Sequence, residues 1–237
     1  MIKVGLVYTS TTPELIMLVE REVYRQLGEQ VELLSYEDPA ILAQTREAGY
    51  VTAEATAKLV DLYMAAVSDG ADAILNLCSS VGEVADAVQS LGKYMGVPIV
   101  RIDEEMCKDA VRKGKRIGVL ATLPTTLTPT KNTLQRVARE LGKQVTLVDG
   151  LIEGAFGLNQ TEFEALLLKA ADKIKNQVDI ILLCQGSMAY CEEVIANTHG
   201  IPTVSSPRYG AIALKAALID KGLLSPTGDK KEGGILC

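Results

Sequence analysis

The chain has 237 residues, of which 48% are hydrophobic, and its formal net charge is −6. No run approaches the roughly 18 apolar residues that a membrane span needs, and residues 1–5 already read as a strand, so we expect no secretory signal. With no Trp, only two Phe and no basic stripe, the chain lacks the groups that bind and stack nucleic acids. We therefore expect a cytoplasmic protein with neither a membrane nor a nucleic-acid partner.

The first half of the chain alternates between strand and helix patterns. Strands are expected over residues 3–10, 31–35 and 73–77 and from Gly96 onward, with helices over 14–27, 54–67 and 81–94. The strands rich in Val, Ile and Leu are hydrophobic throughout, which is typical of parallel strands covered by helices on both faces. This half therefore predicts one α/β lobe.

The second half repeats the first in the same order. Strands are expected over residues 116–122, 145–148 and 179–183 and from Gly200 onward, with helices over 130–141, 162–175 and 189–198. A period of about half the chain is too long for a solenoid, whose repeats run roughly 20 to 50 residues. We predict two pseudo-symmetric, doubly wound parallel-sheet lobes, one formed by residues 1–103 with 208–237 returning to it, the other by 104–207.

Small polar residues stand at the ends of the first and third predicted strands of each half. Ligands of doubly wound sheets bind outside the carboxyl ends of the strands, so we expect the active site in the cleft between the lobes. Hydroxyls and the unpaired N–H groups of helix ends at this edge suit a carboxylate. The predicted substrate-binding residues at this edge are Thr9, Ser10, Ser79, Ser80, Thr122, Gln185, Gly186 and Ser187.

Two cysteines, Cys78 and Cys184, stand directly after a strand in matching places of the two halves. A single such cysteine is more often a small buried hydrophobe, but a matched pair favours function. A nearby helix N-terminus can lower a thiol pKa from its usual value of about 8.5. One thiolate would then remove a proton beside a carboxylate while the other thiol protonates the opposite face. This chemistry inverts a stereocentre.

The remaining cysteines and the glycines point to no second chemistry. Cys107 and Cys191 lie in predicted helices and Cys237 in a polar tail with residues 230–234, to which we assign no function. Without a Cys-x-x-Cys pair and with His199 as the only histidine, neither a zinc site nor a disulfide framework is expected. No glycine-rich phosphate loop occurs, so no nucleotide cofactor is expected.

Around these residues the chain resembles the aspartate/glutamate racemase superfamily, which includes hydantoin and allantoin racemases, maleate isomerase and arylmalonate decarboxylase. The two-lobe repeat and the two strand–cysteine elements carry the resemblance, which covers essentially the whole chain. It implies that no pyridoxal phosphate or other cofactor is used and that Cys78 and Cys184 are the catalytic acid and base. By the same resemblance the substrate carboxylate is surrounded by Thr9, Ser10, Ser79, Ser80, Gly186 and Ser187.

Departures from the family patterns narrow the prediction. Glutamate racemases typically show Asp-Ser after the first strand, where this chain has Thr9-Ser10. They show Cys-Asn-Thr in the first lobe and Cys-Thr-His in the second, where this chain has Cys78-Ser79-Ser80 and Cys184-Gln185-Gly186. These differences disfavour a peptidoglycan-type glutamate racemase. Arylmalonate decarboxylases keep only the second-lobe cysteine, so Cys78 argues against decarboxylation.

A basic residue is expected near the site if the substrate has a second carboxylate. Arg46, in a polar stretch between a strand and a helix, is the first candidate, and its alternative interpretation is a solvated loop arginine. Lys131 and Arg208 are further candidates for the same role.

The sequence thus predicts a cofactor-independent isomerase, a racemase or epimerase of a small carboxylate such as aspartate or glutamate, working by two-cysteine proton transfer. A hydantoin-type racemase or a maleate-type cis–trans isomerase is the alternative within the family. A small-molecule binding protein that closes two lobes without chemistry is the alternative of another class. A homodimer is expected, since symmetric dimers are the commonest soluble oligomers.

Overall fold

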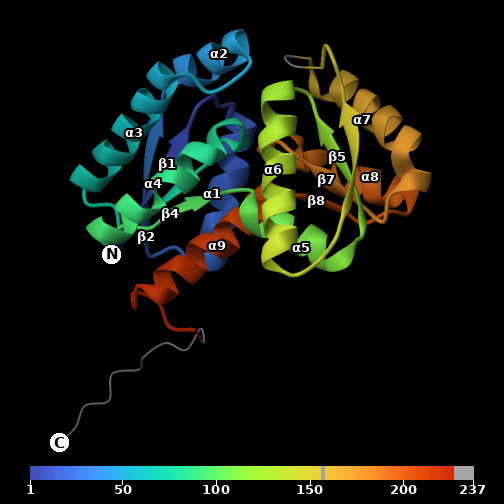
Figure 1. Ribbon diagram of the computed structural model, residues 1–237. Coiled ribbons are helices and arrows are strands. Elements are labelled where there is room, and N and C mark those ends of the chain that lie inside the picture. The colour runs from blue at the N-terminus through green and yellow to red at the C-terminus, as the bar shows by residue number, and fades with distance from the viewer. Residues whose placement is uncertain (156–157, 227–237) are drawn as a thin grey trace, which may run out of the picture.

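The computed structural model describes residues 1–155 and 158–226, so the predicted tail with Cys237 lies outside the described residues. Two lobes stand side by side, each built on a four-stranded, entirely parallel sheet (Figure 1). The sheet orders, β2-β1-β3-β4 and β6-β5-β7-β8, are the same arrangement used twice. The predicted pair of pseudo-symmetric α/β lobes is confirmed.

The first sheet is covered by helices on both faces. Its strands are β1 (Ile2–Tyr8), β2 (Val31–Glu37), β3 (Ala73–Asn76) and β4 (Ile99–Arg101). One face packs against α3 (Ala53–Ser68) and α4 (Gly82–Met95), and the other packs against α1 (Pro13–Leu27) and α9 (Ser206–Asp220). Helix α9, from the end of the described chain, thus contributes to the core of the lobe that contains the first strand.

The second sheet is built in the same way. Its strands are β5 (Arg116–Ala121), β6 (Thr146–Leu151), β7 (Ile180–Leu183) and β8 (Thr203–Ser205). One face packs against α5 (Glu104–Lys113) and α6 (Pro124–Glu140), and the other against α7 (Gln160–Ile174) and α8 (Glu192–His199). Continuous Ile and Leu side chains in β7 supply both faces, because successive side chains of a strand point in opposite directions.

Helix α2 (Pro39–Ala48) was not predicted from the sequence. Its start carries clear signals: Asp38 Oδ1 accepts the Ala40 N–H at 2.9 Å, and Pro39 occupies the first turn, where its missing N–H costs nothing. Arg46 therefore lies in the last turn of a helix and not in a loop. Helix α6 begins at Pro124, six residues earlier than predicted, and accommodates Pro129 inside its second turn.

The lobes meet along two short 3-10 turns that follow the central strands. Helix α6 packs against the turn η1 (Ser79–Val81) of the first lobe, while α1 packs against the turn η3 (Gly186–Cys191) of the second. In Figure 1, α6 stands upright between the lobes. Both turns lie at the carboxyl ends of the strands, so this seam is where a ligand site is expected.

Among the described residues, no helix combines the length and apolar character that crossing a membrane would require.

Candidate active site

Cys78 lies at the carboxyl end of β3, immediately before η1, and its side chain is partly exposed. Hydrogen bonds reach its sulfur from the Thr9 and Ser80 hydroxyls and from the backbone N–H groups of Ser80 and Val81. Burial raises the pKa of the Cys78 thiol, and these donors oppose the shift by stabilising the thiolate. The thiol therefore sits among donors that are ready to stabilise negative charge.

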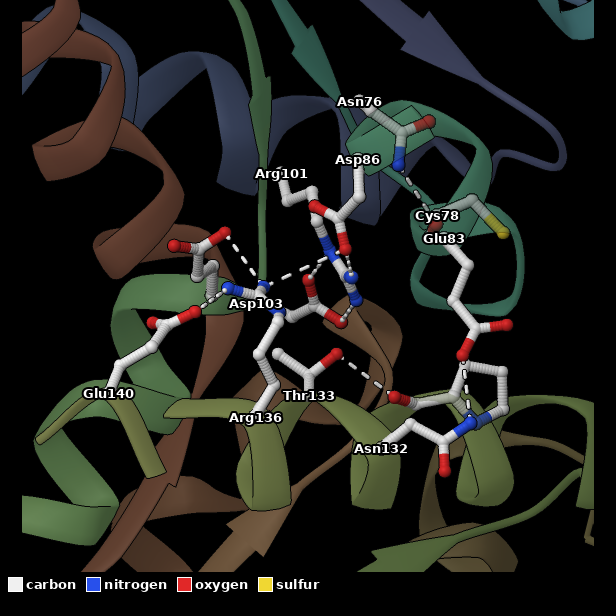
Figure 2. Close-up of polar contacts among 12 residues, drawn as sticks. Asn76, Cys78, Glu83, Asp86, Arg101, Asp103, Asn132, Thr133, Arg136 and Glu140 are labelled. Atoms are coloured by element: carbon white, nitrogen blue, oxygen red, sulfur yellow. Dashed lines mark hydrogen bonds and ion pairs between the residues drawn. The ribbon is translucent and has the colours of Figure 1, made fainter. Parts of the chain in front are cut away.

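Behind Cys78, a buried amide holds the backbone in place. Asn76 Nδ2 donates to the Cys78 carbonyl at 3.0 Å, and the Tyr63 hydroxyl donates to Asn76 Oδ1 at 3.0 Å. Figure 2 shows the Cys78 side chain directed away from this contact. Asn76 and Tyr63 are fully enclosed by the core of α3 and the sheet, so the turn after β3 is fixed from within. Neither residue was predicted to take part in the site.

Cys184 does not occupy the matching position in the second lobe. Gly5 pairs with Ile74 in the first sheet, and its counterpart Gly118 pairs with Ile181 in the second. Counting on from these pairs along β3 and β7, the residue equivalent to Cys184 is Leu77. The backbone confirms the shift: the N–H of Leu77 donates to Val7, and the N–H of Cys184 donates to Leu120, both at 2.9 Å.

A one-residue shift along a strand turns the side chain to the other face of the sheet. Cys184 follows Ile180 and Leu182 into the core beneath α5 and α6, where it is 0% exposed. Its partner there is the Thr130 hydroxyl, and burial raises the pKa of its thiol. The prediction that the two cysteines stand at equivalent sites is therefore wrong, because matching the letters ignored the pairing register.

Gln185 occupies the position equivalent to Cys78. Both residues directly precede a 3-10 turn with extended backbone angles, φ −128° and ψ 115° at Cys78 and φ −115° and ψ 137° at Gln185. The polar partners correspond as well. Thr9 hydrogen-bonds Cys78, and Thr122, four residues after Gly118 as Thr9 is after Gly5, hydrogen-bonds Gln185.

The contacts of Gln185 are close. Its Oε1 accepts the Thr122 N–H at 2.8 Å. The Thr122 hydroxyl lies between both ends of the carboxamide, 3.1 Å from Oε1 and 2.8 Å from Nε2. The amide oxygen is thereby held against the end of β5. The pseudo-twofold site is asymmetric in chemistry, with a thiol in one half and a carboxamide in the other.

The predicted hydroxyls divide between the seam and an open groove. Ser79, Ser80 and Thr122 are buried, and Ser80 Oγ lies 2.7 Å from Thr126 Oγ1 on α6 of the other lobe. Ser10, Gly186 and Ser187 instead line a groove of about 1470 Å³ between α1 and η3. Cys78 is not among the described residues that line the groove. Thr9, which hydrogen-bonds its sulfur, directly precedes Ser10 in the chain.

The basic candidates are spread over the surface. Arg46 is exposed on α2 and does not line the groove. Lys131 Nζ contacts Asp149 at 2.7 Å. Arg208 does line the groove, where its guanidinium lies 3.8 Å from Glu192 and stacks on the Tyr209 ring with 4.8 Å between the guanidinium carbon and the ring centroid. Of the three, Arg208 lies on the groove that also contains Ser10 and Ser187.

An ion cluster around the buried Arg101, not anticipated from the sequence, lies between the first lobe and α6 (Figure 2). Arg101 is 1% exposed and donates to both oxygens of Asp103 at 2.9 and 3.0 Å and to Asp86 at 2.5 Å. Arg136 on α6 contacts Asp86 at 3.6 Å and Glu104 at 3.1 Å. The first lobe is thus joined to α6 by charged pairs.

Within the described residues, no group of three or more His, Cys, Asp or Glu side chains is arranged to hold a metal ion. Cys107 is buried in α5 as predicted, and Cys191 is buried at the end of η3, directly before α8 and not within it.

The sequence profile of the family described as Asp/Glu/Hydantoin racemase matches residues 4–214. Among solved structures, the chain is similar to glutamate racemase RacE1 from Bacillus anthracis, with 17% identity, a TM-score of 0.73 and coverage of 95% of this chain and 84% of that one. It is also similar to allantoin racemase from Klebsiella pneumoniae, with 13% identity, a TM-score of 0.66 and coverage of 94% and 89%.

A third similar structure is the aspartate racemase of Picrophilus torridus, with 16% identity, a TM-score of 0.61 and coverage of 94% of this chain and 95% of that one. No curated protein matches the chain in sequence. At these identities the solved structures establish only the shared fold. Membership of the family rests on the profile match over residues 4–214.

Proposed function

Since this chain belongs to the Asp/Glu/Hydantoin racemase family, we propose that it transfers a proton at the carbon next to the carboxylate of a small substrate, with Cys78 as the acid/base. The observation that carries the proposal is the setting of the Cys78 sulfur. It lies at the carboxyl end of the central strand, within hydrogen-bond reach of the Thr9 hydroxyl and two backbone N–H groups. Donors in this position stabilise a thiolate at the place where such sheets bind ligands.

The substrate class follows from the polar groups of the groove that begins at Ser10, the residue directly after the Cys78 partner Thr9. Hydroxyls of Ser10 and Ser187 and the backbone of Gly186 line the groove, and such groups suit a carboxylate. An amino acid such as aspartate or glutamate is the first class to test, because Arg208 on the same groove offers a positive charge for a second carboxylate. Cyclic ureides of the hydantoin type and maleate-type diacids form the second class.

The two-cysteine version of the mechanism needs Cys184 in the site. Its side chain is fully buried beneath α5 and α6 and bonded to Thr130, and we therefore carry Cys78 alone into this proposal. Because burial raises the pKa of Cys78, the resting group is the thiol at neutral pH. Proton abstraction requires the minor thiolate form, whose share grows as the pH rises.

The test is proton NMR of the protein in heavy water with D- and L-amino acids, hydantoins and maleate, each added separately. The expected result is loss of the α-proton signal of one compound, or conversion of maleate. General acid–base catalysis contributes about 10²- to 10⁴-fold, so Cys78→Ala should slow the reaction by about that factor.

The matched control is Cys107→Ala, which removes a buried thiol from α5 and should leave the rate unchanged. Exchange that persists in Cys78→Ala would refute the role of this thiol. Binding of a panel compound without exchange would favour the non-catalytic binding protein.

A further inference from the structure

We propose that the site transfers protons on one face of the substrate only, because Gln185 stands where a second acid/base would act. This inference rests on the proposed function and deepens it. It predicts exchange of the α-proton with retention of configuration, in one enantiomer, and no interconversion of enantiomers.

The first support is positional. The strand register and the backbone hydrogen bonds make Gln185 the counterpart of Cys78, and the Thr122–Gln185 contact the counterpart of Thr9–Cys78. A pseudo-twofold axis presents counterparts to opposite sides of a ligand held between the lobes. The group facing Cys78 across the substrate is thus the Gln185 carboxamide.

The second support is chemical. A carboxamide neither gains nor loses a proton near neutral pH, so Gln185 can donate a hydrogen bond but cannot act as acid or base. Its oxygen accepts the Thr122 N–H, and one of its two amide N–H groups donates to the Thr122 hydroxyl, which leaves the second N–H for a ligand. The other predicted groups of this half, Thr122 and Ser187, offer only hydroxyls, and His199, the one histidine of the chain, bonds the Leu168 carbonyl between α8 and α7.

The third support is that Cys184 cannot take over the task. Its sulfur shares a core with Ile180 and Leu182, on the face of the sheet opposite to that of Gln185. Bringing it into the site would require a one-residue slip of β7, which would turn every side chain of that strand to the wrong face. Sheets buried on both faces do not tolerate such a slip.

The proton and electron balance is simple. The Cys78 thiolate takes the α-proton, the C–H electron pair passes into the enolate of the carboxylate, and Cys78 becomes a thiol. In heavy water the thiol exchanges with solvent and returns a deuteron to the same carbon on the same face, restoring the thiolate. The net change is replacement of hydrogen by deuterium with the configuration kept.

The experiment combines NMR in heavy water with chiral chromatography on each enantiomer of the compound found active in the panel. The wild-type protein should exchange the α-proton of one enantiomer with deuterium and leave the α-proton of the other in place. It should not convert either enantiomer into the other. Cys184→Ala should behave as the wild type once its melting temperature shows that it is folded. Gln185→Cys should gain interconversion, because it restores a titratable group on the second face.

Enantiomers that interconvert in the wild type, with Cys184→Ala blocking the interconversion, would overturn this inference while leaving the proposed function intact. A Gln185→Cys variant that exchanges one enantiomer without inverting it would also count against the positional argument. Exchange that survives Cys78→Ala, or no exchange of any compound, would instead overturn the proposed function and this inference with it.

Discussion

Replacing Gly82 by Ala probes the ion cluster between the lobes. Gly82 is the first residue of α4, and a Cβ there would lie 2.5 Å from Nη2, 2.6 Å from Cζ and 2.7 Å from Nε of Arg101. The guanidinium has no room to withdraw, because it is fully buried and bonded to both oxygens of Asp103 and to Asp86. The added methyl group must therefore break part of this cluster.

The magnitude follows from two opposing effects. Breaking a buried ion pair costs about 3–5 kcal/mol, and the better helix propensity of Ala returns at most about 1 kcal/mol. We expect Gly82→Ala to lower the free energy of unfolding by about 2–4 kcal/mol. Urea denaturation followed by circular dichroism measures this change.

A double-mutant cycle isolates the cause. Arg101→Ala removes the group that the new methyl would strike, so adding Gly82→Ala to that variant should cost almost nothing. Equal costs of Gly82→Ala with and without Arg101 would refute the reasoning. A second control is Ser90→Ala, on the exposed surface of the same helix, which should shift the unfolding free energy only slightly.

Three further predictions concern the thiols and their supports. The exchange rate should rise with pH beyond the usual thiol pKa of about 8.5, because the pKa of Cys78 is raised; a profile that levels off below pH 8 would contradict this. The folded protein keeps the Cys184 proton at a pH where the unfolded chain loses it, so the free energy of unfolding should fall above about pH 8.5, and less steeply in Cys184→Ala, in pH-dependent urea melts. Asn76→Ala should lower kcat more than it raises KM, because the Cys78 carbonyl loses its hydrogen bond, and it should cost about 1–3 kcal/mol of stability, because the buried Tyr63 hydroxyl loses its acceptor. An unchanged kcat would show that the turn after β3 needs no such support.

Much of the architecture could be predicted because the same order of strands and helices occurs in both halves of the chain. Uniformly hydrophobic strands at matching intervals, such as those ending before Thr9 and Thr122, indicate buried parallel sheets without further information. The missed helix α2 shows the limit of hydrophobic patterns, because only Asp38 and Pro39 signal its start and its apolar face is short.

The site was harder to predict than the fold because it depends on register. A one-residue difference separates Cys184 from Gln185, yet it decides which of them faces the seam and which the core. Sequence alone locates a strand end only to within a few residues, whereas the pairing of Gly118 with Ile181 locates it unambiguously. The Arg101 cluster was not predicted for another reason: besides its near neighbour Asp103, it depends on Asp86 from α4 and, through Asp86, on Arg136 from α6, and no local pattern indicates these contacts.

The position of α9 has a consequence for how the chain is made. Ala211, Leu214 and Leu218 of this helix complete the core around Leu6 and Leu75, although more than a hundred residues of the second lobe are translated between them. A nascent chain that has emerged only as far as β8 therefore has every strand of the first sheet, yet one face of that sheet stays partly uncovered. The first lobe to be translated is therefore completed last. Until α9 is translated, the apolar area that α1 leaves uncovered is a target for chaperones and an aggregation risk.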